Sequence, residues 1–202
     1  MKWLFADKVS LICVILGIAL LLSGVVVLVS MEVSASHSPR DTQQLLEKVQ
    51  ALIPQPVSKV PQERGNNAMA ARQIDGINVG GILEFPKYER TLPVASAWDT
   101  SLVESLPCRF TGSIYDRSLI IGAVDGEGQI SFAASMDAGD VIYLTDMEGG
   151  RYAYRVTAIH HAKHATLEKL QSGDYALTIF VKDNKTAEYL LIRCQTESEA
   201  TR

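Results

Sequence analysis

From Ile74 onward the chain consists of short apolar runs separated by glycine, proline and aspartate, and this pattern limits the fold more than any other feature. Short apolar runs bounded by turn-forming residues are typical of β-strands. Eight such runs occur, at residues 77–79, 82–85, 92–95, 118–123, 141–145, 152–159, 175–181 and 189–193. Eight strands are enough to close a small barrel without free edges. The sequence therefore predicts a mainly β domain over residues 74–197, built as a closed eight-stranded barrel with short helices.

Two connections between these runs have a predictable structure. The segment 146–150, Asp-Met-Glu-Gly-Gly, supplies the acidic and glycine residues that a tight hairpin requires. Residues 166–171 form one amphipathic helical turn that ends before Gly173. We expect this turn to pack on the rim of the barrel.

The N-terminal region predicts a membrane anchor. Residues 9–31 contain no charged side chain and are dominated by Leu, Val and Ile, and this length exceeds the ~20 residues that cross a bilayer as a helix. Lys2 and Lys8 precede the segment, which predicts a cytoplasmic N-terminus over residues 1–8 and an extracellular remainder. The alternative is a cleaved signal peptide, with residues 33–35, Val-Ser-Ala, as the cleavage site.

Residues 32–73 predict a short helix and a stalk. Asp41 and Thr42 can cap a helix in which apolar residues recur at helical spacing, at 45, 46, 49, 52 and 53. Pro54 and Pro56 end it. Residues 54–73 mix proline, glycine and polar residues without apolar periodicity, as expected of an exposed stalk, and residues 198–202 form a tail.

The net charge argues against binding to nucleic acid, and the cysteines leave two structural alternatives. Residues 32–202 carry a net charge of −5, because Lys2, Asp7 and Lys8 contribute +1 to the total of −4. The sequence contains no basic patch that would indicate binding to nucleic acid. Cys108 and Cys194 lie in the predicted barrel, where they form either one disulfide or two buried thiols.

Three histidines, His160, His161 and His164, cluster after a predicted strand. Two of them have the spacing of a helical metal-binding pair, but no acidic or cysteine ligand accompanies them at a recognised spacing. A solvent-facing segment is the favoured interpretation, and the sequence predicts neither a metal nor a cofactor.

Beyond periodicity, the order of motifs over about residues 77–195 resembles a sortase domain of Gram-positive bacteria, class B-like in its upstream layout. The matching segments are 82–87 (Ile-Leu-Glu-Phe-Pro-Lys), 92–94 (Leu-Pro-Val), Trp98, 107–113 (Pro-Cys-Arg-Phe-Thr-Gly-Ser), 119–123 (Leu-Ile-Ile-Gly-Ala), 138–142 (Ala-Gly-Asp-Val-Ile), 145–146 (Thr-Asp), 152–156 (Tyr-Ala-Tyr-Arg-Val), 177–178 (Leu-Thr) and 191–194 (Leu-Ile-Arg-Cys). The resemblance implies a membrane-anchored cysteine transpeptidase that cleaves a sorting signal and transfers the acyl group to an amine.

The resemblance also implies three catalytic positions, and none holds the family's residue. Val124 stands where the family has its histidine, Lys182 where it has its cysteine, and Tyr189 where it has its arginine. Valine cannot transfer a proton, lysine would form a stable amide rather than a thioester, and tyrosine carries no positive charge at neutral pH. We therefore expect no catalytic residue at these positions.

The sequence predicts a pseudoenzyme, a sortase-like domain that binds a sorting-signal-like peptide, or docks on a pilin, an active sortase or another secreted or cell-wall-sorted protein. One alternative is an active sortase that uses Cys108 or Cys194 with one of the clustered histidines. Another is a structural or sensory domain, because a fold alone does not determine function. An open groove favours peptide binding, and a groove filled by Lys182 and Tyr189 favours the structural role.

Overall fold

The structure is a computed structural model that describes residues 39–59, 68–126 and 129–197, all within a compact unit that spans His37–Arg202. The predicted anchor at residues 9–31, the N-terminal residues 1–8 and the tail 198–202 lie outside the described residues. Among the helices that are described, none has the length and apolar character needed to cross a membrane.

The described elements are mostly strands. In chain order they are α2 (Pro39–Leu52), β1 (Val57–Ser58), β2 (Arg72–Ile74), β3 (Ile77–Phe85), the 3₁₀ turn η1 (Pro86–Tyr88), β4 (Arg90–Ala95), η2 (Leu102–Glu104), β5 (Cys108–Thr111), β6 (Leu119–Val124), η3 (Ala133–Ser135), β7 (Val141–Asp146), β8 (Gly150–Ala162), α3 (Leu167–Gln171), β9 (Leu177–Lys182) and β10 (Tyr189–Thr196).

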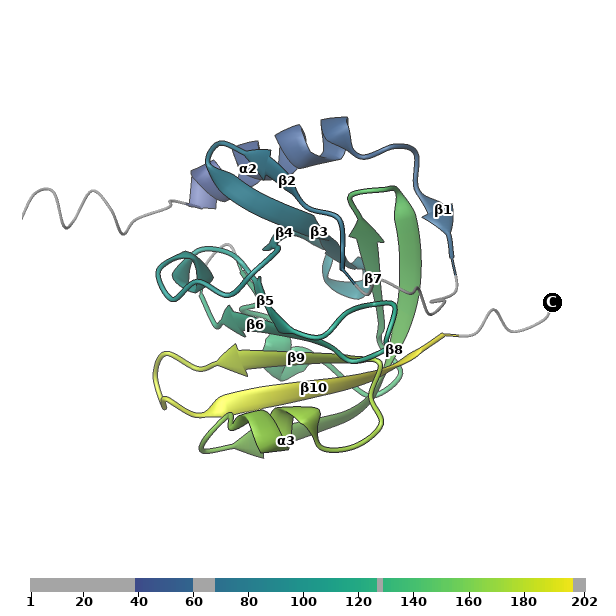
Figure 1. The fold of residues 1–202 in the computed structure, drawn as a ribbon. Coiled ribbons are helices and arrows are strands. Elements are labelled where there is room, and N and C mark those ends of the chain that lie inside the picture. Colours follow the sequence, from purple (N-terminus) through teal and green to yellow (C-terminus); the bar gives the residue numbers. More distant parts are fainter. Residues whose placement is uncertain (1–38, 60–67, 127–128, 198–202) are drawn as a thin grey trace, which may run out of the picture. The chain divides into compact units, whose positions relative to one another are not determined.

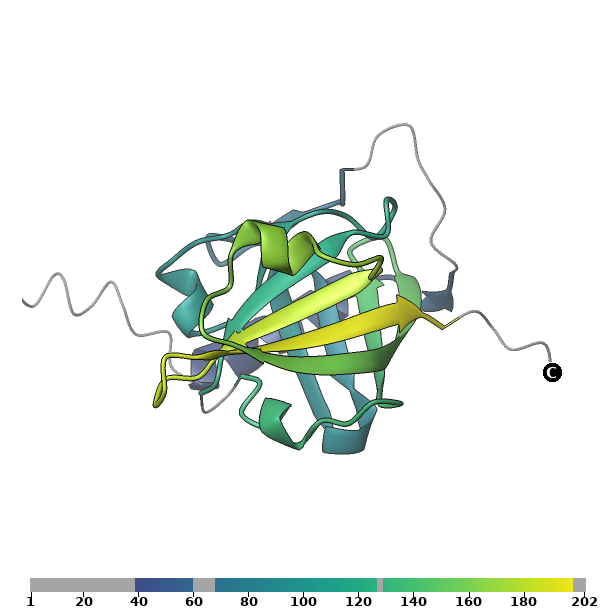
Figure 2. The same cartoon turned by 90° about the horizontal axis from the view of Figure 1, so that it is seen from below.

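Strands β3 to β10 close into a barrel. Neighbouring strands pair in the order β3-β4-β5-β6-β9-β10-β8-β7, and β7 pairs again with β3. The pairs β4–β5 and β6–β9 are parallel and the others antiparallel, so the barrel is mixed. Helices α2 and α3 lie on opposite sides of it (Figure 1), and Figure 2 shows α3 beside the strands β9, β10 and β8. The predicted closed eight-stranded, mainly β fold is confirmed.

Within the barrel, the assignment of the predicted runs to strands differs from the observed one at two places, and the first is β3. The runs 77–79 and 82–85 form one strand, because Gly80 and Gly81 make a bulge rather than a turn. A Cβ on Gly81 would lie 2.5 Å from the carbonyl oxygen of Thr145 on β7. The glycine therefore permits close approach of two backbones inside the sheet, which is a common use of glycine in strands.

The second difference is β5, Cys108–Thr111, which the sequence did not predict as a strand. Only Cys108 of its four residues is fully buried, so the segment lacks the apolar run of its neighbours. It forms because β6 pairs with it along one side and Ala95 of β4 on the other. Pairing with the neighbouring strands thus makes this segment a strand, although its local sequence pattern does not predict one.

The barrel interior holds the main apolar core. Side chains at alternate positions of β6, β9 and β10 point inward, for example Ile121, Ile179 and Ile192, which are at most 1% exposed. The residues between them, such as Ile120, Phe180 and Leu191, form a separate buried cluster on the outer face of the same strands. This alternation follows from the period of two in a strand. The outer face is therefore apolar as well.

The region predicted as a helix and stalk packs partly on the barrel. Helix α2 begins at Pro39, before the predicted cap residues, and buries Leu45 and Val49 in a cluster with the neighbouring strands. Leu52, predicted on the same face, is 46% exposed. In the predicted stalk, β1 pairs with β8 and β2 pairs with β3. These two segments are thus part of the sheet rather than a free stalk.

The predicted hairpin and helical turn are both confirmed. Asp146 Oδ1 accepts from the backbone amides of Glu148 and Gly150, at 2.9 and 2.7 Å, and Gly149 has φ of 81°. Thr166 is the N-cap of α3 and accepts from the amide of Lys169. These caps satisfy backbone donors that would otherwise be free.

A charged cluster ties η1 to the segment before β7. Lys87 Nζ lies 2.9 Å from Asp140 and 3.0 Å from Asp137, and the Tyr88 hydroxyl donates to Asp140 at 2.8 Å. Burial alone would raise the pKa of Asp140, but hydrogen bonds from the Asp137 amide, Lys87 and Tyr88 hold it below its ordinary value. The ionised carboxylate is therefore the form that stabilises this corner.

Candidate functional site

Val124, Lys182 and Tyr189 lie side by side on three neighbouring strands. Val124 is paired with Lys182 across the parallel strands β6 and β9, and Lys182 is paired with Tyr189 across the antiparallel strands β9 and β10. Each side chain shares the outer face with Phe180, two residues before Lys182. The fold thus brings together three residues that are far apart in the sequence.

These three residues line an open groove on the outer face of the barrel. Its empty space, including the open mouth, is about 840 Å³. One wall is the segment after β4, which contributes Trp98, Thr100, Val103 and Glu104. Phe110 of β5 and Ala165, which precedes α3, also line it. The groove is therefore a hollow with a mainly apolar lining and a few polar groups at its rim, which is the usual character of a ligand site.

Three aromatic rings form its floor and one wall. The ring centroids of Trp98, Phe110 and Phe180 lie 5.3 to 5.7 Å apart, and Tyr189 lies 6.4 Å from Phe180. The Phe110 ring meets both of its neighbours edge to face, at 87° and 89°, which is a favoured geometry. Trp98 is 37% exposed and Phe180 is 5% exposed. The cluster thus offers an apolar surface that is partly open to solvent.

Gly122 makes room for this cluster. A Cβ at this position would lie 2.4 Å from Phe180 Cζ and 2.4 Å from Trp98 Cζ3. Both distances are far below a carbon–carbon contact of about 3.5 Å. Two rings can therefore rest on the strand only because residue 122 has no side chain.

Val124 closes the groove at one side. It is 3% exposed and belongs to the same buried cluster as Val103 of η2 and Leu106. The buried Gln129 links these segments, since its amide nitrogen donates to Val103 O at 3.0 Å and its oxygen accepts from the Val124 amide. The position is thus apolar and packed, and it offers no group that can transfer a proton.

Lys182 and Tyr189 are half-buried at the groove. Within residues 39–59, 68–126 and 129–197, neither side chain has a hydrogen-bond or ion-pair partner. Glu104, which also lines the groove, is exposed and makes no salt bridge with Lys182. An ammonium group thus faces an apolar groove without a neutralising carboxylate.

The two cysteines of the barrel are separate and buried. Cys108 and Cys194 are free thiols with no exposed surface, so the structure supports the two-thiol alternative over the disulfide. Burial raises the pKa of Cys108 to about 11 and also raises that of Cys194. Neither thiol lines the groove. Both therefore lack the exposure and the low pKa that a nucleophilic cysteine needs.

The clustered histidines are exposed, as the sequence predicts, although His160 and His161 belong to β8 rather than to a loop. His164 follows that strand. No three His, Cys, Asp or Glu side chains in the described part of the chain are placed to hold a metal ion.

Arg193 supports the wall of the groove from below. It is 4% exposed, and its guanidinium donates to the carbonyl oxygens of Lys169 and Leu170 at the end of α3 and to Thr178 Oγ1 at 2.9 Å. Burial lowers its pKa below the ordinary value. The buried arginine thus binds carbonyl groups near the end of α3. Ala165, which lines the groove, lies just before the start of this helix.

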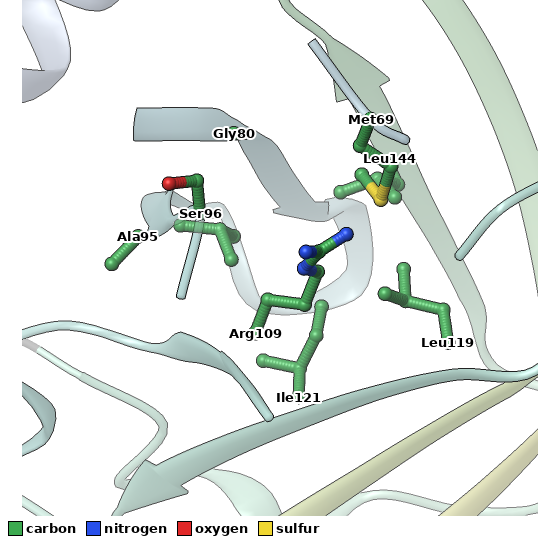
Figure 3. A pocket seen from close by; sticks show the side chains of 9 residues that line it. Met69, Gly80, Ala95, Ser96, Arg109, Leu119, Ile121 and Leu144 are labelled. Carbon is green, nitrogen blue, oxygen red and sulfur yellow. The ribbon is translucent and has the colours of Figure 1, made fainter. Parts of the chain in front are cut away.

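A second, smaller pocket lies inside the barrel. Figure 3 shows the side chain of Arg109 reaching between Ser96, Ile121 and Leu144. Its empty space, including space open to solvent, is about 270 Å³, and the guanidinium donates to Gly112 O at 3.4 Å. Apart from Arg109 and Ser96 the lining is apolar, so no pair of groups suited to acid–base chemistry meets there.

Comparison with known proteins gives the fold. Neither a family model nor a curated protein matches the chain. Among solved structures, sortase C1 of Streptococcus agalactiae matches with a TM-score of 0.53 at 19% identity, covering 63% of this chain and 72% of that one. Sortase C1 of Streptococcus suis matches with a TM-score of 0.51 at 20% identity, covering 61% and 75%.

The chain has a sortase-like fold. A third match, sortase C of Clostridium perfringens, was solved with the C-terminal cell wall sorting motif; its TM-score is 0.51 at 19% identity, with 59% of this chain and 71% of that chain covered. The TM-scores establish the shared fold, and at these low identities the activities remain those of the matched proteins. The class B-like subclass stays a prediction, since the matched proteins are sortases C.

Sequence reasoning missed Phe110 and Phe180, which line the groove, and Gly122 and Gln129, which hold neighbouring parts of it in place. A signal was present for Phe180, which lies between two inward-facing residues and so had to point outward from a strand. An aromatic residue on the outer face of a closed barrel indicates a cover or a ligand surface. No comparable signal marks Gln129, because its partners are backbone groups distant in sequence.

Proposed function

We propose that this protein is a membrane-anchored pseudoenzyme with a sortase-like fold, which binds a peptide in the groove over β6, β9 and β10 without cleaving it. The observation that carries the proposal is the open aromatic groove beside Val124, Lys182 and Tyr189. A lining of this kind binds apolar side chains of an extended segment. The bound segment belongs to a secreted or cell-wall-sorted protein, a pilin or an active sortase at the outer face of the membrane.

The chemistry of the three positions argues against cleavage. Val124 is buried among apolar side chains and has no titratable group, so nothing at this position activates a nucleophile. An acyl group on the Lys182 amine would be an amide, which is stable to transfer. Losing the members of a catalytic unit together removes their cooperation.

The alternatives receive less support. An active enzyme that used Cys108 or Cys194 would need a thiol that is exposed and easily ionised, whereas both are buried with raised pKa values. A purely structural role would fit a filled groove, but Lys182 and Tyr189 leave it open.

Binding and cleavage can be measured in one experiment. The full chain in detergent micelles, carrying Trp3→Phe so that Trp98 is its only tryptophan, is mixed with sorting-signal peptides and an amine acceptor. We expect Trp98 emission to change with peptide concentration, while mass spectrometry detects no cleaved or transferred product. Product formation that persists in a Cys108→Ser, Cys194→Ser variant would point to an unrecognised nucleophile and overturn the proposal.

The groove is tested with a matched pair of variants. Phe110→Ala removes a ring from the groove, and Phe132→Ala removes a ring that contacts Phe85 and Tyr88 elsewhere. We expect weaker binding in the first variant and unchanged binding in the second. Equal affinities in both variants would place the peptide outside the groove.

A further inference from the structure

Resting on the proposed peptide binding, we propose that the groove selects a free C-terminal carboxylate, which pairs with Lys182, preceded by apolar residues that cover the rings of Trp98, Phe110 and Phe180. Three features support this: Lys182 is an unpaired cation, an apolar floor leads to it, and acidic residues lie beyond it.

The first step is the state of Lys182. Its side chain is half-buried, lines the groove and has no carboxylate partner among the described residues. The lysines that do pair are on the surface, as with Lys48 and Asp75 at 2.6 Å. A cation beside a desolvated apolar surface binds an anion more strongly than one in open water, because the local dielectric constant is lower. Lys182 is thus available for an anionic group of a ligand.

The second step is the position of this cation along the groove. Lys182 is the last residue of β9, and its partner Val124 is the last residue of β6. The rings of Phe180 and Phe110 lie on the floor before this point. A peptide lying along the floor therefore places apolar side chains on the rings first and meets the ammonium group where the floor strands stop.

The third step is what lies past the strand ends. Asp125 N donates to Lys182 O at 2.8 Å, and Asn184 Nδ2 donates to Asp125 O at 3.2 Å, so the chain closes over the ends of both strands. A neighbouring hollow that shares Tyr189 with the groove is lined by three acidic residues, Asp125, Asp183 and Glu188.

These acidic residues bear on whether the anionic group of the ligand is its C-terminal carboxylate or an acidic side chain. A peptide that continued past Lys182 would run toward like charges if it were acidic, and the chain as a whole has a net charge of −4. A peptide that ends at Lys182 presents one negative group and stops before this region. The terminal carboxylate therefore fits better than an acidic side chain within a longer segment.

The test compares three N-acetylated pentapeptides of leucine and alanine. The first has a free C-terminal carboxylate, the second a C-terminal amide, and the third an amide with glutamate at its fourth position. Each is titrated into the full chain carrying Trp3→Phe, with Trp98 emission as the readout. We expect the free acid to bind about tenfold more tightly than the plain amide, as for one charge-assisted hydrogen bond. This ratio should shrink at high salt.

Two variants locate the effect. Lys182→Met removes the ammonium group and retains most of the side-chain length, so the acid-to-amide ratio should fall to about one. Lys185→Met removes an equal charge from the exposed β9–β10 turn and should leave the ratio unchanged. A ratio that falls equally in both variants would show general attraction to positive charge and would refute the specific pairing.

The remaining outcomes separate this inference from the proposed function. Equal affinity of the acid and the plain amide overturns the carboxylate preference and leaves peptide binding intact. Tight binding of the glutamate peptide alone assigns the charge to a side chain and overturns the terminal assignment. If isothermal titration calorimetry and Trp98 emission detect binding neither of these peptides nor of the sorting-signal peptides, the proposed function itself fails.

Discussion

Replacing Gly122 by alanine tests whether the aromatic cluster depends on the missing side chain. The new methyl group would lie 2.4 Å from both Phe180 Cζ and Trp98 Cζ3. An ordinary contact needs about 3.5 to 4.0 Å, so both rings have to move away from the methyl group by roughly 1 Å or more. Phe180 is 5% exposed and Trp98 is 37% exposed, so Trp98 is the ring that can leave.

The cost follows from what Trp98 loses. Its ring contacts Phe110 and Phe180, and an aromatic pair contributes about 0.5 to 1.5 kcal/mol beyond its buried area. The loss of two pairs gives about 1 to 3 kcal/mol, which is also the usual cost of an added methyl group in a packed site. For a chain of this size we expect the melting temperature to fall by roughly 2 to 12 °C.

The assay is thermal unfolding together with Trp98 emission, in the full chain carrying Trp3→Phe. We expect a lower melting temperature and a red shift, because the indole ring becomes more exposed. Gly126→Ala is the matched control, since its Cβ would have no atom within 4 Å. A Gly122→Ala protein with the stability and emission of the control would refute the inferred packing.

Three further predictions concern stability and are read from thermal unfolding. Ala187 has φ of 57°, a strained value for alanine, so Ala187→Gly should raise the unfolding free energy by about 1 kcal/mol. The pKa of Asp140 is lowered in the folded state, so its stabilisation is present above the unfolded pKa of about 3.9 and is lost as pH falls through the folded value. Asp140→Asn should therefore lower the melting temperature at pH 7 and flatten its dependence on pH below about 4; an unchanged melting curve at both pH values contradicts this. Arg193→Met should cost about 2 to 4 kcal/mol, because carbonyl groups of α3 lose a buried charged donor.

The barrel could be predicted from the sequence because most of its strands are buried on one face or on both. Six of the predicted runs correspond each to one strand, and the other two merge in β3. The merger was missed because glycine in a sequence marks a turn and a bulge alike. Only the closeness of Thr145 to Gly81 distinguishes the two, and that contact is made between distant parts of the chain.

The site could be predicted in part. Register between β6, β9 and β10 brings Val124, Lys182 and Tyr189 together, as expected if the three positions form one site. The walls of the groove were not predictable, because they come from the segment around Trp98 and from β5, whose placement depends on long-range pairing. The sequence thus indicates which positions meet but not the surface that surrounds them.

Register explains how such a site can change its chemistry while the fold persists. Hydrogen bonds between backbones, not side chains, pair residue 124 with residue 182, so the strands bring these positions together whatever residues occupy them. A valine at position 124 then gains burial against Val103 and Leu106. A histidine there would have to bury an imidazole among apolar groups, at a cost of about 1 to 3 kcal/mol if its nitrogens found no partners. A nucleophile introduced in place of Lys182 alone would therefore have no base at position 124, and a base introduced there as well would work against the packing of Val124 at one side of the groove.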